Sequence, residues 1–189
     1  MQTERCPMPT GLHPLREAII RRSPEAGELR RRLLAIGGNR VCLQVPDLDL
    51  PALLSRGRDF PTEGVRRRRL ERNQCHRNVA TLWCNAPGRV RIATGYALSD
   101  DGLWRQHSWA VKGGRVIETT ERRTAYHGIT LTLEEALAFT MSNPPEFLLA
   151  WSGEARAELR SHLLAALKRD EVNTVKQWLR ARGQGRHVT

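Results

Sequence analysis

The spacing of apolar side chains changes twice along the chain. In residues 1–72 it follows helical intervals, in residues 73–131 one helical stretch is followed by alternation, and in residues 132–182 helical spacing returns. Intervals of three and four predict amphipathic helices, whereas alternation predicts half-buried strands. The pattern therefore predicts a single α+β domain over residues 1–189, in which a small antiparallel β-sheet is flanked by helices.

The N-terminal helices have recognisable ends. Ser23 followed by Pro24 predicts a helix start, with the serine as N-cap and the proline in the first turn. Gly37-Gly38 predicts the end of this helix. Its buried stripe is expected at Leu29, Leu33, Leu34 and Ile36. A second helix, a strand, a helical turn and a polar connecting loop are expected over residues 14–22, 40–45, 51–54 and 56–72, respectively.

The middle part of the chain is expected to hold one helix and four strands. The helix covers residues 75–83 and ends before Pro87-Gly88. Ser99-Asp100-Asp101-Gly102 and Gly113-Gly114 have the composition of tight hairpin turns. These turns place the strands over residues 90–98, 103–111, 115–119 and 124–131.

The C-terminal part begins with a clear helix start. Thr132 and Glu135 have the spacing of a capping box, and the helix that they open is expected to reach about Thr140. Two further helices are expected over residues 152–169 and 170–182. They have apolar stripes but no residues that suggest chemistry, so packing or a partner surface is their expected role.

The Gly113-Gly114 turn decides which side chains share a face of the predicted sheet. With a two-residue turn, Lys112 pairs with Arg115, and counting outward places His107 and Glu118 on one face as diagonal neighbours. A carboxylate in that place can orient an imidazole ring. A three-residue turn would reverse the faces, so this relation depends on the turn.

Cys75 stands at the start of the middle helix. The N–H groups of a helix start, with a protonated histidine nearby, lower the pKa of a thiol from about 8.5 into the range of roughly 3.5–7.5. The N–H of Cys75 and the side chain of Gln74 or Asn73 would face the position of an oxyanion. Polar neighbours distinguish this cysteine from a buried structural thiol. The sequence thus predicts a thiolate nucleophile at this position.

A cysteine at a helix start, then His107-Ser108-Trp109 in a strand, then Glu118 in the next strand, resembles the papain-like superfamily of thiol enzymes. This superfamily includes proteases, cell-wall peptidases, transglutaminases and toxin deamidases. The resemblance covers about residues 70–131 and implies a papain-like arrangement, with Cys75 as nucleophile, His107 as general base and then acid, and Glu118 as the orienting group. Glu118 departs from the asparagine or aspartate that is more usual at the third position.

The activity implied by this resemblance is that of a cysteine-dependent hydrolase or acyltransferase. Cys75 would attack an amide, as in a peptidase, amidase, deamidase or transglutaminase, and form a thioester that water or an amine resolves. No cofactor and no metal are expected for this chemistry. The expected substrate is an amide-containing compound such as a protein or peptide.

Other residues compete for places in the predicted site. His127, in the last strand, is the main rival to His107 as the base. Asn78 lies one helical turn from the cysteine and is expected to hold the helix start or to line the cleft. Trp104 and Trp109 are expected to wall the site or, like most tryptophans in strands, to pack in the core. His76 is expected at the surface or behind the reacting groups.

A zinc site is the alternative chemistry. Four soft ligands are present, namely Cys75, His76, Cys84 and His107. Structural zinc sites use closely spaced ligand pairs, and the two cysteines of this set are too far apart in sequence to form one. The four cysteines of the chain include no C-x-x-C pair and are expected to be reduced thiols.

Basic residues outnumber acidic ones by 31 to 20, and the net charge is +11. The densest run is Arg66–Arg69, which predicts a surface for an acidic partner. This run supports a second hypothesis, a non-enzymatic basic binding module for nucleic acid or an acidic protein, in which Cys75 is structural. Nucleic acid is the less favoured partner, because no nucleic-acid-binding motif accompanies the run and few aromatic residues surround it.

Apolar runs long enough to span a membrane, about 18 residues, do not occur in the sequence. Residues 1–10 contain acidic, basic and proline residues and no apolar core of a secretory signal. No membrane association is therefore expected. The expected location is the cytoplasm, or outside the cell after export without a cleavable signal.

Overall fold

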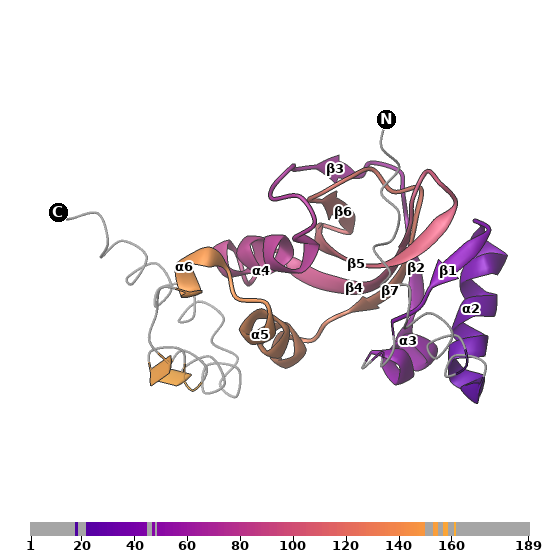
Figure 1. The fold of residues 1–189 in the computed structure, drawn as a ribbon. Helices are drawn as coiled ribbons and strands as arrows, with labels where there is room; N and C mark the ends of the chain where they lie inside the picture. The colour runs from indigo at the N-terminus through magenta and orange to yellow at the C-terminus, as the bar shows by residue number, and fades with distance from the viewer. Residues whose placement is uncertain are drawn as a thin grey trace.

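The chain is a mixed α+β structure in which helices lie around a curled β-sheet (Figure 1). Its structure is a computed structural model that describes residues 22–44, 47 and 49–149, with isolated positions at 18, 153, 154, 157, 158 and 161. The helices expected over residues 14–22, 152–169 and 170–182 lie wholly or mostly outside the described residues.

The described part of the chain has helices at both ends and four consecutive strands after α4 (Cys75–Asn85). In chain order they are α2 (Pro24–Ile36), β1 (Arg40–Cys42), α3 (Leu50–Arg56), β2 (Arg58–Phe60), β3 (Arg66–Arg67), α4 (Cys75–Asn85), β4 (Arg91–Leu98), β5 (Leu103–Lys112), β6 (Arg115–Glu118), β7 (Ala125–Thr130), α5 (Leu133–Ser142) and α6 (Glu146–Leu149).

Local signals place α2 and α5 as the sequence predicts. The Ser23 hydroxyl accepts a hydrogen bond from the N–H of Ala26 at 3.1 Å, which confirms the N-cap of α2. The capping box that opens α5 is also confirmed. Leu29 and Leu33 are fully buried, but Ile36 is 38% exposed because it stands at the end of α2, where its side chain meets solvent. The prediction of a buried Ile36 is therefore wrong.

The sheet is mixed, whereas the sequence predicts an antiparallel one. Its strand order is β2-β7-β4-β5-β6-β3, and β1 also pairs with β5. The β1–β5 and β3–β6 pairs are parallel, and the other pairs are antiparallel. β2 and β3 come from residues 56–72, which are predicted to form a loop. Strands of two or three residues are too short to show alternation, and tertiary pairing alone creates them.

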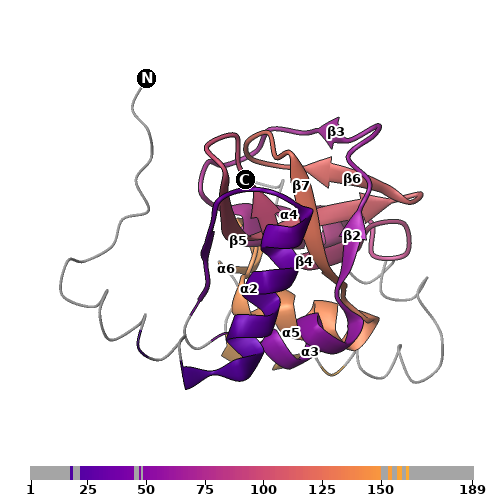
Figure 2. The same ribbon diagram turned by 90° about the vertical axis from the view of Figure 1, so that its right-hand side faces the viewer.

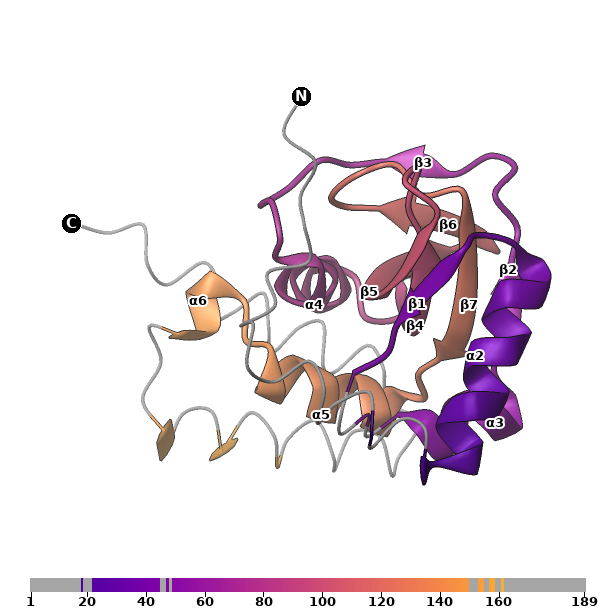
Figure 3. The ribbon, with the colours of Figure 1, turned by 45° about the vertical axis from the view of Figure 1, so that its right-hand side comes forward.

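The two faces of the sheet pack on different apolar cores. On the outer face, helices α2 to α6 pack against strand residues such as Tyr96 and Trp104 (Figures 2 and 3). The inner face curls around a smaller core built by strands, which contains Phe60, Trp109 and Tyr126. Residues that pair directly across strands share a face, so the register assigns each candidate side chain to one of these two cores.

Gly95 in β4 is a position where we expect a side chain to be strongly destabilising. Its φ of +155° suits glycine, and an added Cβ would overlap the carbonyl oxygen of His127 on β7. Gly95→Ala is expected to lower the free energy of unfolding by about 2–4 kcal/mol, as measured by urea titration. In Gly27→Ala, by contrast, the Cβ enters open space on a helix and should raise stability by about 0.5–1 kcal/mol. Equal stability of the two variants would contradict this account.

Candidate active site

The start of α4 lies against the centre of β5, where one edge of this strand is left unpaired between β1 and β6. On the β5 edge opposite β4, β1 pairs with Leu103–Arg105 and β6 pairs with Ala110–Lys112. No strand of the described residues pairs with residues 106–109 on this edge. α4 packs against β5 (Figure 3), and Cys75 is the first residue of α4. The gap therefore lets Cys75 approach His107.

His107 and Glu118 meet as the two-residue turn predicts. Lys112 pairs with Arg115 across Gly113-Gly114, which confirms the register. Nε2 of His107 lies 3.0 and 3.2 Å from the two carboxylate oxygens of Glu118. Because an ionised carboxylate can only accept, Nε2 carries the proton of this bond, and Nδ1 is the nitrogen left for the thiol.

The Glu118 carboxylate is buried but fully hydrogen-bonded. Its side chain is 1% exposed. Besides His107, it accepts hydrogen bonds from the N–H and hydroxyl of Thr120 at 2.8 and 3.0 Å and from the hydroxyl of Tyr126 at 2.9 Å. A buried charge is tolerated only where it is paired in this way. These bonds hold the carboxylate, and through it the imidazole ring, in one orientation.

Electrostatics in this cluster favour a thiolate–imidazolium pair. Burial alone would raise the pKa of Cys75, but hydrogen bonds and positive charge from His107 and His76 lower it to about 5. Burial also disfavours the charged form of His107, yet Cys75 and Glu118 raise its pKa to about 9. Against its own burial, Glu118 is held at a pKa of about 2, chiefly by His107. At neutral pH the cysteine and the glutamate are therefore anions, and His107 between them is a cation.

His76 is closer to the reacting sulfur than the sequence predicts. Its Nδ1 lies 3.3 Å from Sγ of Cys75, and its ring packs edge-on against Phe139 of α5. Adjacent residues on a regular helix point in different directions. Cys75 is the first residue of α4, and the residue before it is not helical. No earlier turn of the helix therefore restricts the Cys75 side chain, which can turn toward His76. His76 thus provides a second hydrogen bond to the thiolate.

Cys84, on the same helix, shows what burial does to a thiol without such partners. It is 6% exposed, and burial raises its pKa to about 12. Cys75 is only half-buried. Cys42, Cys75 and Cys84 are not in disulfide bonds in the described part of the chain, and Cys6 lies outside it. The environment, and not the residue type, gives Cys75 the lower pKa of the two.

The three residues near the start of α4 that are predicted to bind an oxyanion, hold the helix start or line the cleft occupy different environments. Asn78 is buried and donates to the Glu71 carbonyl at 2.7 Å, so it holds the segment that leads into α4. Asn73 is exposed and has a φ of +56°, which turns the chain toward the helix. Gln74 is the N-cap residue, but its side chain makes no capping bond. An oxyanion-binding role for Gln74 or Asn73 stays a prediction.

Trp109 lies behind the catalytic candidates. It is fully buried in the inner core, and its ring is stacked with that of His107 at a centroid distance of 6.3 Å. Its neighbours Phe60 and Tyr126 are each 5.1 Å away by the same measure. Trp109 therefore restricts the ring of His107 and keeps water from its inner side.

His127 lies away from the predicted triad. Its register partners are Tyr96 and Asp59, whereas His107 pairs with Gly95. The two histidines therefore face opposite sides of the sheet. Nδ1 of His127 lies 2.7 Å from Oδ1 of Asp59. The sequence alone does not show which face of the sheet His127 occupies relative to His107. That depends on the register of β4 with both β5 and β7, which only the structure gives.

The described part of the chain contains no set of side chains arranged as metal ligands. No group of three or more His, Cys, Asp or Glu residues there is arranged to hold a metal ion. Likewise, no helix among the described residues is long and apolar enough to cross a membrane.

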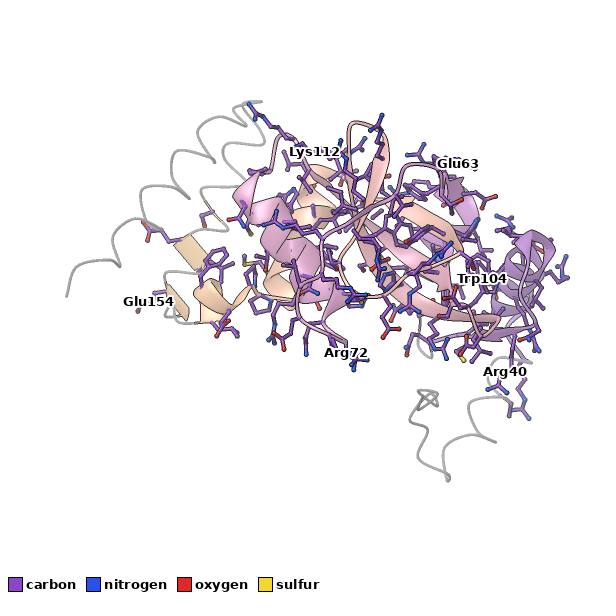
Figure 4. All side chains as sticks on the ribbon, turned by 90° about the horizontal axis from the view of Figure 1, so that it is seen from above. Arg40, Glu63, Arg72, Trp104, Lys112 and Glu154 are labelled. Atoms are coloured by element: carbon purple, nitrogen blue, oxygen red, sulfur yellow. The ribbon has the colours of Figure 1, made fainter. Side chains whose placement is uncertain are left out.

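Side chains fill the interior of the curled sheet, and basic residues such as Arg72 and Lys112 project at its margins (Figure 4). Within this setting His107 links the two ends of the site: it lowers the pKa of the half-buried Cys75 thiol and contacts the buried carboxylate of Glu118. Comparison of the chain with family models, curated proteins and solved structures finds no match.

Proposed function

We propose that the protein is a cysteine-dependent hydrolase or acyltransferase that acts on an amide, with a papain-like arrangement of nucleophile, base and orienting residue. The observation that supports it best is the buried contact of His107 with Glu118 at 3.0 Å, combined with the lowering of the Cys75 pKa by His107 and His76. A structural cysteine has no need of a buried, fully hydrogen-bonded carboxylate behind a histidine. Perturbed pKa values combined with such geometry are typical of catalytic groups.

The first half of the reaction transfers the acyl group to sulfur. The Cys75 thiolate attacks the amide carbonyl carbon, an S–C bond forms, and the π electrons move to the carbonyl oxygen. Free N–H groups at the start of α4 are suited to stabilise this oxyanion. When the C–N bond breaks, Nδ1–H of His107 protonates the leaving amine or ammonia, and the thioester remains.

The second half releases the acyl group. His107, now neutral, takes a proton from water or from an acceptor amine, which attacks the thioester carbonyl. The S–C bond breaks, the electron pair returns to sulfur, and His107 is again the cation. Glu118 stays ionised throughout and stabilises that cation. Water gives hydrolysis or deamidation, and an amine gives acyl transfer.

The test is to trap the thioester with an activated ester such as p-nitrophenyl acetate. The wild type is expected to release a burst of p-nitrophenol, and intact-mass measurement after an acid quench should show one acetyl group on Cys75. Cys84→Ala should retain the burst, because that thiol is buried and protonated. Cys75→Ala should lose it. Peptide amides and glutamine peptides can then separate cleavage, deamidation and transfer by their products.

A non-enzymatic basic binding module is the second hypothesis, and the exposure of all four residues of Arg66–Arg69 favours it. This hypothesis predicts no acyl adduct on Cys75. A wild type that shows no burst above that of His107→Ala, with both proteins folded by circular dichroism, would contradict the enzyme hypothesis and leave the binding module.

A further inference from the structure

A cavity of about 480 Å³ reaches Glu118 without being lined by Cys75 or His107. One wall is formed by Thr62, Gly64 and Val65, between β2 and β3, and another by residues 122–124, between β6 and β7. Glu118 and Tyr126 are its buried lining residues. A volume of this size is in the range of roughly 300–1,000 Å³ that is usual for small-molecule sites.

Three arginines line this cavity, and none of them has an anionic partner among the described residues. They are Arg67 from β3 and the adjacent residues Arg122 and Arg123. Within the part of the chain that the structure describes, none of them forms a salt bridge. Nη1 of Arg123 donates to the hydroxyl of Ser99, whereas its Nε is buried and has no hydrogen-bond partner among the described residues.

Glu118, which also lines the cavity, does not neutralise these arginines. Its Cα pairs in register with that of Arg67, yet the two side chains form no salt bridge. The carboxylate oxygens are already occupied by His107, Thr120 and Tyr126. The lining therefore carries three positive charges and one negative charge, and the negative charge is balanced by the imidazolium of His107.

We propose that this cavity binds a small organic anion that carries a carboxylate or a phosphate group. Arg67, Arg122 and Arg123 would supply the positive charge, and the hydroxyls of Thr62 and Thr124 offer further donors. Guanidinium groups bind planar carboxylates and phosphates through paired hydrogen bonds, and an incomplete hydrogen-bond set such as that of Arg123 Nε favours an acceptor. None of these five residues takes part in the proposed acyl transfer, so the site does not depend on that function.

The test is a titration of the full-length protein with inorganic phosphate and, separately, with succinate, at constant ionic strength. Calorimetry and amide NMR should show saturable binding of one equivalent, with shifts concentrated in residues 62–67 and 122–126. Arg67→Gln and Arg122→Gln are each expected to weaken binding by about tenfold, the usual loss of a charged hydrogen bond. Arg69→Gln is the matched control, because Arg69 belongs to the same arginine run as Arg67 but does not line the cavity. Its loss of one positive charge should change affinity by less than about twofold.

Saturation by phosphate alone would identify a phosphorylated ligand, and saturation by succinate alone a carboxylate. No saturation with either anion would overturn the proposal, as would an equal loss of affinity in Arg69→Gln, which would indicate a diffuse basic surface. Neither anion contains an amide or an ester, so this result is independent of acylation at Cys75. Failure of the anion site and failure of the proposed enzyme activity can therefore be told apart.

Discussion

Replacing His107 with alanine is expected to raise the pKa of the Cys75 thiol from about 5 to its ordinary value or above. Burial raises this pKa, and His107, which lowers it more than His76 does, is lost. Between about pH 6 and pH 8, the rate of alkylation by iodoacetamide should change less than about twofold in the wild type, because the thiolate is fully formed there. In His107→Ala the rate should rise about 75-fold, as for a thiol with a pKa of about 8.5.

Cys84 is the internal control for this measurement. Because its thiol is buried and its pKa is raised to about 12, peptide mass analysis should find it unlabelled in the folded protein and labelled after denaturation. The shape of the profile is the informative quantity, since a low-pKa thiolate is also a weaker nucleophile. A flat profile in a folded His107→Ala variant would show that another group sets the pKa of Cys75.

Replacing Glu118 with glutamine is expected to lower the pKa of His107, because burial still disfavours the imidazolium and one of the two anions that stabilise it is gone. A neutral His107 neither stabilises the thiolate nor protonates the leaving amine. Acyl transfer should therefore fall by about 10²–10⁴-fold. The acidic limb of the alkylation profile, at about pH 5 in the wild type, should move upward by at least about one pH unit.

Tyr126→Phe is the matched control for Glu118→Gln. It removes one hydrogen bond to the carboxylate but leaves the charge and its contact with His107. We expect a loss of acyl transfer below about tenfold and no shift of the acidic limb, since a neutral hydrogen bond contributes only about 0.5–1.5 kcal/mol. If the two variants behave alike while both remain folded, hydrogen bonding and not charge is what Glu118 contributes.

The contact between His107 and Glu118 could be predicted because it depends on local information. Gly113-Gly114 determines a two-residue turn, the turn determines the register, and the period of two determines the shared face. The capping box at Thr132 could be predicted for the same reason. Each of these features is encoded within a few neighbouring residues.

Features that depend on contacts distant in sequence could not be predicted. β2 and β3 are too short to show a pattern, and they exist because β7 and β6 offer them hydrogen-bonding edges. The separation of His127 from His107 follows from pairing of β4 with two other strands. The arginine-lined cavity combines residues from β3 with the segment between β6 and β7, which are about fifty residues apart.

The sequence by itself determined the helix start that carries Cys75 and the hairpin that joins His107 to Glu118, because turn residues and side-chain alternation act over short distances. Only the tertiary structure decided that the two meet. Strands β1 and β6 pair with opposite ends of the same edge of β5. Helix α4 packs against the unpaired segment of β5 between them. The hairpin with β6 is local, but no local interaction specifies that gap, since it arises when β1 and α4, which are distant in sequence from β5, pack on the same strand.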